Sequence, residues 1–142
     1  MATIRVDLDT IQTTTAKALE AHGAKPWIAN SVAHAVRVAE AHDNKICGLF
    51  YLQSYCSQLV TGRVNGNVEP EVHQPKPASV VVDAKLGFAQ AAFSRGLDTA
   101  LLAATTHAAA TLAIAHSPTC SAIESVHEQI ALAGYTPFRI LT

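Results

Sequence analysis

Two cysteines and one histidine are the residues that could do chemistry without a cofactor. His116 and Cys120 lie four residues apart in "HSPTC", and Cys47 lies far upstream in "NKICG". A thiolate beside an imidazole can act as a nucleophile or transfer a proton, although an isolated cysteine has a pKa near ~8.5 and needs a tuning environment. These side chains could also ligate a metal, but no second ligand spacing supports such a site and we expect none. The sequence favours the simpler alternative, in which both cysteines are small buried hydrophobic residues.

The composition narrows the function classes. The net charge is -1 with no basic cluster, so we expect neither nucleic acid nor an anionic membrane as a partner. Apolar runs are too short to span a bilayer, and the N-terminus "MATIRVDLDT" does not read as a signal peptide. An odd count of 3 cysteines without a CxxC spacing favours reduced thiols and a cytoplasmic location. No Gly-x-Gly-x-x-Gly loop is present, and we therefore expect no bound nucleotide cofactor.

The first third of the chain is predicted to be helical and must position Cys47. Asp7 or Asp9 can cap a helix that Gly23 ends, and Pro26 suits the first turn of a second helix. A third helix is expected over 49–60, ending before Gly62. The Pro- and Gly-bearing stretch 63–78 has no regular periodicity and is predicted to be a connector.

The remainder alternates strands and helices and must position the "HSPTC" turn. "SVVVD" and "TLAIA" are predicted buried strands, the Ala-rich stretch 89–107 a helix, and the tail "YTPFRILT" has strand character. A helix capped by Ser121 and stopped by Gly134 lies between the last two strands. We therefore expect an α/β fold in one compact domain: a helical lobe over 1–62, the connector over 63–78 and a β-α-β-α-β segment over 79–142.

Several of these segments together resemble the malate/L-lactate dehydrogenase-type reductases, a non-Rossmann family. They are "GLFYLQSYCSQLVTGRVNGNVEPEV", "VVVDAKLGFAQAA" and the unit from "AIAHS" to "AGY". The similarity is greatest to the branch that reduces Δ1-piperideine-2-carboxylate and Δ1-pyrroline-2-carboxylate with NADPH, and it covers essentially the whole chain. It implies the N-terminal half of the family fold, in which a small mixed or parallel sheet with crossover helices follows a helical lobe.

The catalytic positions of that family carry other residues here. The family's Ser-His-Gly falls on Ile46, Cys47 and Gly48, its arginine on Tyr51, and its second histidine on Thr119. Reducing a C=N or C=O bond requires a hydride donor, a proton donor and a cation for the substrate carboxylate. Isoleucine and threonine cannot exchange protons near neutral pH, and tyrosine cannot be a cation. On its own the chain should therefore not be an NADPH reductase.

Three functions remain open. The first is a truncated, redox-degenerate homologue of imino and 2-oxo acid reductases that acts as a small-ligand-binding or partner subunit, assembling with itself or with a longer reductase-like chain. The high apolar fraction of 49% against 15% charged residues favours such burial. The second is a cofactor-free isomerase, lyase or cyclase acting on a small cyclic imine or 2-oxo acid. If the family geometry holds, its pocket would be formed by Cys47, Tyr51, His116, Thr119 and Cys120. The third is one subunit of a split NAD(P)H-dependent oxidoreductase.

Overall fold

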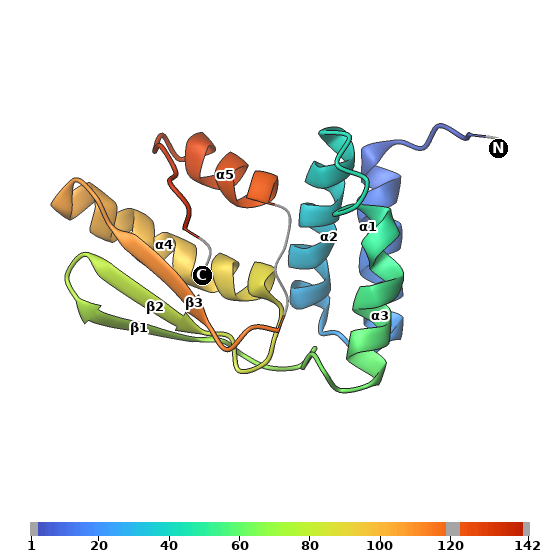
Figure 1. Ribbon diagram of the computed structural model, residues 1–142, viewed down its shortest axis with the longest axis horizontal. Coiled ribbons are helices and arrows are strands. Elements are labelled where there is room, and N and C mark those ends of the chain that lie inside the picture. The colour runs from blue at the N-terminus through green and yellow to red at the C-terminus, as the bar shows by residue number, and fades with distance from the viewer. Residues whose placement is uncertain (1–2, 119–122, 141–142) are drawn as a thin grey trace.

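The computed structural model describes residues 3–118 and 123–140 and is an α/β fold, as expected. A lobe of helices lies beside a small sheet that is covered by a long helix (Figure 1). The elements follow one another along the chain as α1 (Leu8–Ala21), α2 (Pro26–Ala41), the 3-10 turn η1 (Leu49–Tyr51), α3 (Leu52–Val60), β1 (Glu71–Lys76), β2 (Ser79–Asp83), α4 (Ala89–His107), β3 (Thr111–Ala115) and α5 (Ile123–Leu132).

The helical lobe forms where caps and apolar spacing predict it. Asp7 is the N-cap of α1, and its carboxylate accepts the Thr10 backbone N–H at 2.8 Å. The helix ends before Gly23, whose φ of 101° lies in the left-handed region that glycine adopts without strain. Pro26 opens α2 at a position where the missing N–H costs nothing. The sequence predictions for both helices are confirmed.

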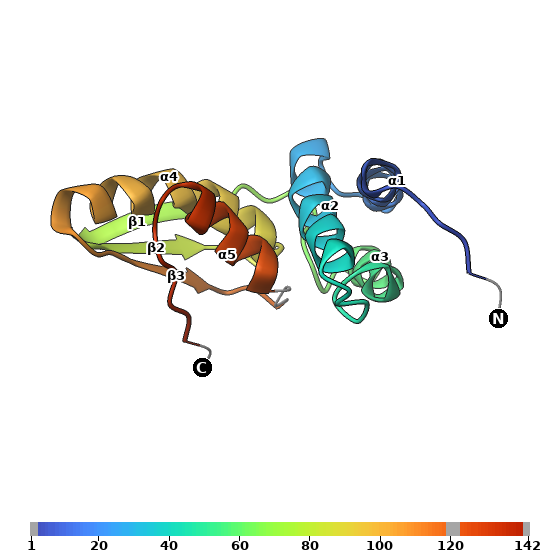
Figure 2. The ribbon, with the colours of Figure 1, turned by 90° about the horizontal axis from the view of Figure 1, so that it is seen from above.

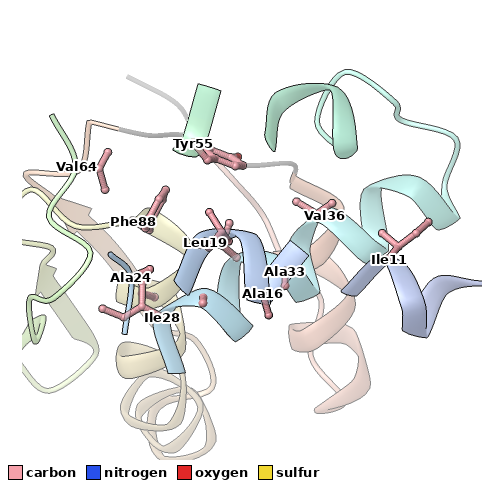
Figure 3. Packing of buried hydrophobic residues seen from close by; sticks show 13 residues of the cluster. Ile11, Ala16, Leu19, Ala24, Ile28, Ala33, Val36, Tyr55, Val64 and Phe88 are labelled. Atoms are coloured by element: carbon pink, nitrogen blue, oxygen red, sulfur yellow. The ribbon is translucent and has the colours of Figure 1, made fainter. Parts of the chain in front are cut away.

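One apolar core holds the lobe together and extends into α4. Leu19 from α1 and Val32 and Val36 from α2 are fully buried in it, and Tyr55 from α3 covers one side. Phe88, at the N-cap of α4, inserts into the same cluster (Figure 3). Because Phe88 precedes the helix that covers the sheet, this side chain ties the lobe to the rest of the fold.

The sheet is mixed and three-stranded, in the order β1-β2-β3. β1 pairs with β2 antiparallel and β2 with β3 parallel, and α4 is the crossover between the two parallel strands. Helix α4 packs on one face of the sheet (Figure 2), and a Cβ built on Gly96 would lie 2.5 Å from Cγ2 of Val82. The close approach of helix and sheet therefore requires glycine at this position. The mixed sheet and the crossover helix confirm the predicted fold class.

Two of the predictions about which segments form strands are wrong. The segment expected to be an irregular connector contains β1, which is exposed along its whole length and tolerates Pro75 because it is an edge strand. Its single valine, Val72, gives no apolar alternation for a sequence pattern to detect. The tail over 135–140, expected to be a strand, pairs with no strand within the described residues, and Phe138 there is 91% exposed.

The strand β3 also differs from its prediction. We expected "TLAIA" to be buried, but its residues are exposed or half-buried, and Ile114 is 36% exposed. The reason is topological: β3 is at the end of the sheet order, with β2 on one side and no strand of the described residues on the other. The division into 1–62, 63–78 and 79–142 as structural units stays a prediction.

Candidate functional site

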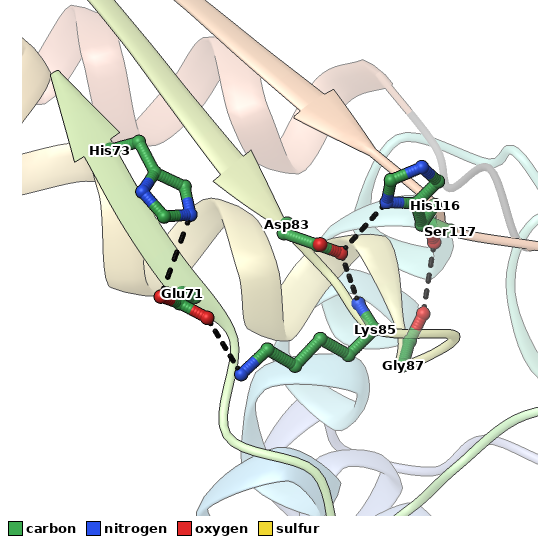
Figure 4. A network of polar contacts seen from close by, with 7 residues as sticks. All are labelled: Glu71, His73, Asp83, Lys85, Gly87, His116 and Ser117. Carbon is green, nitrogen blue, oxygen red and sulfur yellow. Dashed lines mark hydrogen bonds and ion pairs between the residues drawn. The ribbon is translucent and has the colours of Figure 1, made fainter. Parts of the chain in front are cut away.

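A polar cluster forms where the two parallel strands end. Asp83, the last residue of β2, pairs in register with Ala115, the last residue of β3, so the turns that follow both strands meet at one edge of the sheet. His116 follows Ala115 directly, and its imidazole Nδ1 lies 3.0 Å from Oδ1 of Asp83 (Figure 4). The side chain of His116 is 70% exposed, so solutes can reach the imidazole.

The backbone at this edge is held in an uncommon conformation. Lys85, Leu86 and His116 have φ angles of 49°, 64° and 52°, which side-chain-bearing residues rarely adopt. Hydrogen bonds between the turns fix these angles, since the Ala84 N–H donates to the Ala115 carbonyl at 2.9 Å and the Leu86 N–H to the His116 carbonyl at 2.8 Å. Strain held in place by such contacts is concentrated at functional sites in proteins, which makes this edge the candidate site.

The charges in the cluster are arranged in a chain of opposite signs. The Lys85 backbone N–H donates to Asp83 at 2.8 Å and holds the pKa of that carboxyl below its ordinary value, and the His116 imidazole lowers it further. The Lys85 ammonium lies 2.9 Å from Oε2 of Glu71. This contact lowers the pKa of Glu71 and raises that of Lys85, and His73 reaches the same carboxylate at 3.7 Å. Asp83 therefore stays ionised and orients the imidazole of His116.

An imidazole held by a carboxylate is a general-base arrangement. When Nδ1 donates to Asp83, the carboxylate fixes the tautomer and leaves Nε2 as an acceptor for a proton. The same carboxylate stabilises the imidazolium that forms after proton transfer. The pair can thus remove and return protons, but it supplies no hydride.

The predicted site residues are only partly brought together. His116 belongs to the polar cluster, whereas Cys47 lies half-buried in the turn before η1, and no hydrogen bond joins the two within the described residues. Thr119 and Cys120, the other predicted members of the pocket, lie outside the described residues. Across residues 3–118 and 123–140, no three histidine, cysteine or acidic side chains gather as a metal site would require.

The turn that carries Cys47 is tightly built. The Asn44 side-chain amide donates to Glu124 of α5 at 2.9 Å, which ties the turn to the far end of the chain. A Glu40 carboxylate oxygen accepts the Leu49 backbone N–H at 2.7 Å, and a Cβ on Gly48 would lie 2.1 Å from the same oxygen. Gly48 is therefore needed so that the Glu40 carboxylate can reach the Leu49 backbone N–H. This requirement is independent of any catalytic role of the neighbouring residues.

The residues around that glycine form an exposed apolar surface, which we call the 46–51 segment. Ile46 is 70% and Phe50 78% exposed, and Leu49 and Tyr51 are partly exposed beside them. The Tyr51 ring packs edge-on against Tyr55, with ring centroids 4.9 Å apart, and is thereby held at the surface. No described side chain of this segment other than Cys47 and Tyr51 could titrate, so the surface suits apolar contact better than proton transfer.

Sequence reasoning missed the partner of His116. That partner, Asp83, is the last residue of "SVVVD" and accepts the Lys85 backbone N–H at 2.8 Å in the turn that follows. The contact with His116 depends on the parallel register of β2 and β3, which local patterns do not specify. The one available signal was the pair of polar residues that directly follow two apolar runs, "VVVD" and "AIAH".

Comparisons with known proteins agree with this architecture. Residues 6–139 match the sequence profile of the family described as malate/L-lactate dehydrogenase. The chain is 29% identical over 131 residues to a Δ1-pyrroline-2-carboxylate/Δ1-piperideine-2-carboxylate reductase of Pseudomonas aeruginosa, an alignment covering 92% of this chain and 39% of the relative. A reductase of the same description from Pseudomonas putida is 28% identical over 138 residues, covering 97% of this chain and 40% of the relative.

Two of the solved structures that resemble the chain are malate dehydrogenases. The enzyme from Entamoeba histolytica superposes with a TM-score of 0.85 at 19% identity, over 94% of this chain and 37% of that one. The enzyme from Pyrococcus horikoshii gives a TM-score of 0.84 at 21% identity, over 92% of this chain and 38% of that one. At these identities the likeness shows the fold alone. The chain spans about two-fifths of the length of the relatives it matches.

Proposed function

Because this chain belongs to the malate/L-lactate dehydrogenase family, we propose that it is a redox-degenerate relative of the imino and 2-oxo acid reductases. In this proposal it acts as a partner subunit, in the cytoplasm, and does not reduce substrates with NADPH on its own. The partner is a longer reductase-like chain or a second copy of this one.

The observation that carries the proposal is the exposed 46–51 segment. The positions that hold the family's serine and arginine in our alignment carry Ile46 and Tyr51, and Phe50 beside them is largely exposed. Burying a large apolar side chain at an interface is worth about 1.5–3 kcal/mol relative to leaving it in water. An apolar surface of this kind favours protein contact, and among its described side chains only Cys47 and Tyr51 carry a proton that could be transferred.

The free edge of β3 supports the same proposal. An exposed strand edge presents backbone N–H and C=O groups that can pair with another strand, and it is usually covered or blunted. Within the described residues β3 pairs only with β2, and Ile114 lies partly exposed on it. Size measurement of the isolated chain, and co-purification with a longer reductase-like chain, test whether these surfaces are covered in solution.

NADPH-dependent turnover distinguishes the partner subunit from a split oxidoreductase. A split enzyme would gain imine reduction when the longer chain is added, in excess of what the longer chain does alone. A partner subunit would change the size of the complex without adding a second active site. Reduction of a cyclic imine by the isolated chain would contradict both.

A second candidate function rests on the Asp83–His116 pair. A carboxylate-oriented imidazole at the carboxyl ends of parallel strands can abstract a proton from the carbon next to a C=N or C=O group and return it, as an isomerase does. Such chemistry needs no coenzyme. The thiols of Cys47 and Cys120 stay predicted participants, and an unchanged activity in C47S would remove Cys47 from that set.

A further inference from the structure

The free edge of β3 is chemically unlike the opposite edge of the sheet. The outer strand there, β1, carries Pro75 and the charged residues Glu71 and Lys76, and such residues keep an exposed edge from pairing with another strand. Strand β3 has the sequence "TLAIA" and contains neither proline nor charge. The residues of β3 therefore do nothing to prevent the addition of a further strand.

The backbone groups that face this edge follow from the parallel pairing. The Thr111 N–H donates to the Ala78 carbonyl at 2.9 Å, so Thr111 points its backbone groups toward β2. Because these directions alternate along a strand, Leu112 and Ile114 point theirs away from β2. Within the described residues no strand pairs with them on that side. Each of the two residues thus offers an N–H and a carbonyl to an added strand.

The side chains of the same two residues lie on the face that α4 covers. A Cβ built on Gly96 of α4 would lie 2.8 Å from Cδ1 of Leu112. Ile114 is in register with Val82, which is buried against α4 on that face. The apolar row under α4 therefore continues as far as the free edge.

The N-terminal residues 3–7, which we call the arm, match this edge. They form no helix or strand and extend away from α1 (Figure 1). Ile4 is 84% and Val6 45% exposed, and both are β-branched residues, which favour strands. At a separation of two positions, Ile4 and Val6 share one face of an extended chain, as Leu112 and Ile114 do. The arm can therefore place two apolar side chains beside the two of β3.

The arm of one copy does not point toward its own β3. It leaves the lobe beyond α1, and α2 lies between α1 and the sheet (Figure 2). The tail over 135–140 fits the edge less well, because Pro137 has no backbone N–H and the Tyr135 hydroxyl is hydrogen-bonded to that of Thr105 on α4. A second copy of the chain supplies the arm without either constraint.

The charge of the arm suits the sheet that it would join. Arg5 alternates with Ile4 and Val6 and so lies on the other face of the extended arm. It forms no ion pair with the residues that the structure describes. The face of the sheet opposite α4 carries the ionised carboxylate of Asp83, beside the alanines of β3. Arg5 of a second copy would lie over these small side chains and be attracted to Asp83.

The arm also leaves the lobe at the same end as the 46–51 segment. The Arg37 guanidinium, near the end of α2, lies 3.0 Å from the carboxylate of Asp9 in the first turn of α1. The arm precedes α1 and the 46–51 segment follows α2, so both emerge at this end. A copy that extends its arm to a neighbouring β3 therefore brings its 46–51 segment into the same contact.

We propose that the chain forms a dimer in which the arm of each copy adds as a strand to the free edge of β3 in the other. The inference rests on the proposed function, since it takes the second copy as the partner and names the segments that meet. Main-chain hydrogen bonds to Leu112 and Ile114 hold the added strand, and Ile4 and Val6 extend the apolar row under α4. Exchange of one identical segment in both directions closes the dimer.

The test on the full chain combines light scattering with amide hydrogen exchange measured by NMR, at high and low protein concentration. We expect a dimer at high concentration, in which the Leu112 and Ile114 amides exchange slowly. Dilution to the monomer should accelerate their exchange at least about tenfold. Fast exchange in the dimer, or slow exchange that dilution does not change, would overturn the inference. A chain that is monomeric alone would also overturn it, without affecting the complex with a longer reductase-like chain that the proposed function allows.

Variants of Ile4 test the arm itself without touching the folded core. I4D puts a charge into the apolar row and should raise the dimer dissociation constant by about tenfold or more. I4V keeps a β-branched apolar side chain and should dimerise like the unmodified protein. V60D, which charges a side chain that is 69% exposed on α3, is the matched control. If I4D dimerises as V60D does, the inference is wrong; the proposed function stands in that case if I46D/F50D still loses association.

Discussion

The imidazole Nδ1 of His116 lies 3.0 Å from Oδ1 of Asp83, across 33 positions of sequence. Two parallel strands bring them together, and the backbone on both sides is held in the left-handed region. The contact makes a proton-transfer pair without a hydride source. Proton transfer by this pair would not require the hydride transfer that a reductase performs.

The first prediction concerns that pair. With a 2-oxo acid or cyclic imine in D₂O, the protein should catalyse exchange of the proton next to the C=O or C=N group. Replacing His116 in H116Q should lower the rate by about 10²-fold, the usual minimum contribution of a general base. H73Q is the matched control, since His73 contacts Glu71 in the same cluster but not Asp83. Equal rates in H116Q and H73Q would exclude the pair as the catalyst.

The second prediction concerns stability in acid. The pKa of Asp83 is lowered in the folded protein, so its ionised form stabilises the fold above the ordinary carboxyl pKa, near ~3.9. That stabilisation should be lost as the pH falls through the lowered folded pKa. D83N retains an oxygen for the Lys85 N–H but loses the charge. Urea unfolding from about pH 5 to pH 2 should therefore show a shallower pH dependence for D83N. Identical slopes would contradict the lowered pKa.

The third prediction concerns the approach of α4 to the sheet. Alanine is normally better than glycine inside a helix by up to about 1 kcal/mol. At Gly96 a Cβ would meet the Val82 and Leu112 side chains at 2.5 and 2.8 Å, so G96A should instead destabilise the protein by about 1–3 kcal/mol. D98A, at an exposed position of the same helix, should be neutral or stabilising. A stabilised G96A protein would show that the helix stands further from the sheet.

The fourth prediction concerns the side chain that joins the lobe to α4. Phe88 is fully buried in the lobe core, and F88A should cost about 3–5 kcal/mol of unfolding free energy. F138A removes the same atoms from a phenylalanine that is 91% exposed and should be nearly neutral. A small loss in F88A would mean that the lobe does not depend on α4.

Local sequence patterns were sufficient for the elements that have a buried stripe or a strong cap. Asp7, Gly23 and Pro26 delimit the first two helices through backbone rules that need no tertiary context. Local sequence patterns were insufficient for β1. The side chain of Val72 in that strand is exposed, and the strand is defined by its pairing with β2. The patterns also overestimated the burial of "TLAIA", since burial of an edge strand depends on what covers it.

The candidate site was predictable only in its parts. His116 was recognised by residue type, but its contact with Asp83 requires the register that matches Asp83 with Ala115. The resemblance to the reductases drew attention to positions 46–51, and their functional role stays a prediction. Their apolar exposure became visible only in three dimensions, because a helix-compatible pattern of Leu49, Phe50 and Leu52 reads equally well as core.

The most direct test of the central claim is the association state by light scattering during size-exclusion chromatography, alone and with a longer reductase-like chain. We predict a complex with that chain or with a second copy. The double variant I46D/F50D should lose it while keeping its circular dichroism spectrum, and V60D, which charges a side chain that is 69% exposed on α3, should retain it. A chain that stays monomeric in every mixture, or an I46D/F50D protein that associates as V60D does, would contradict the account.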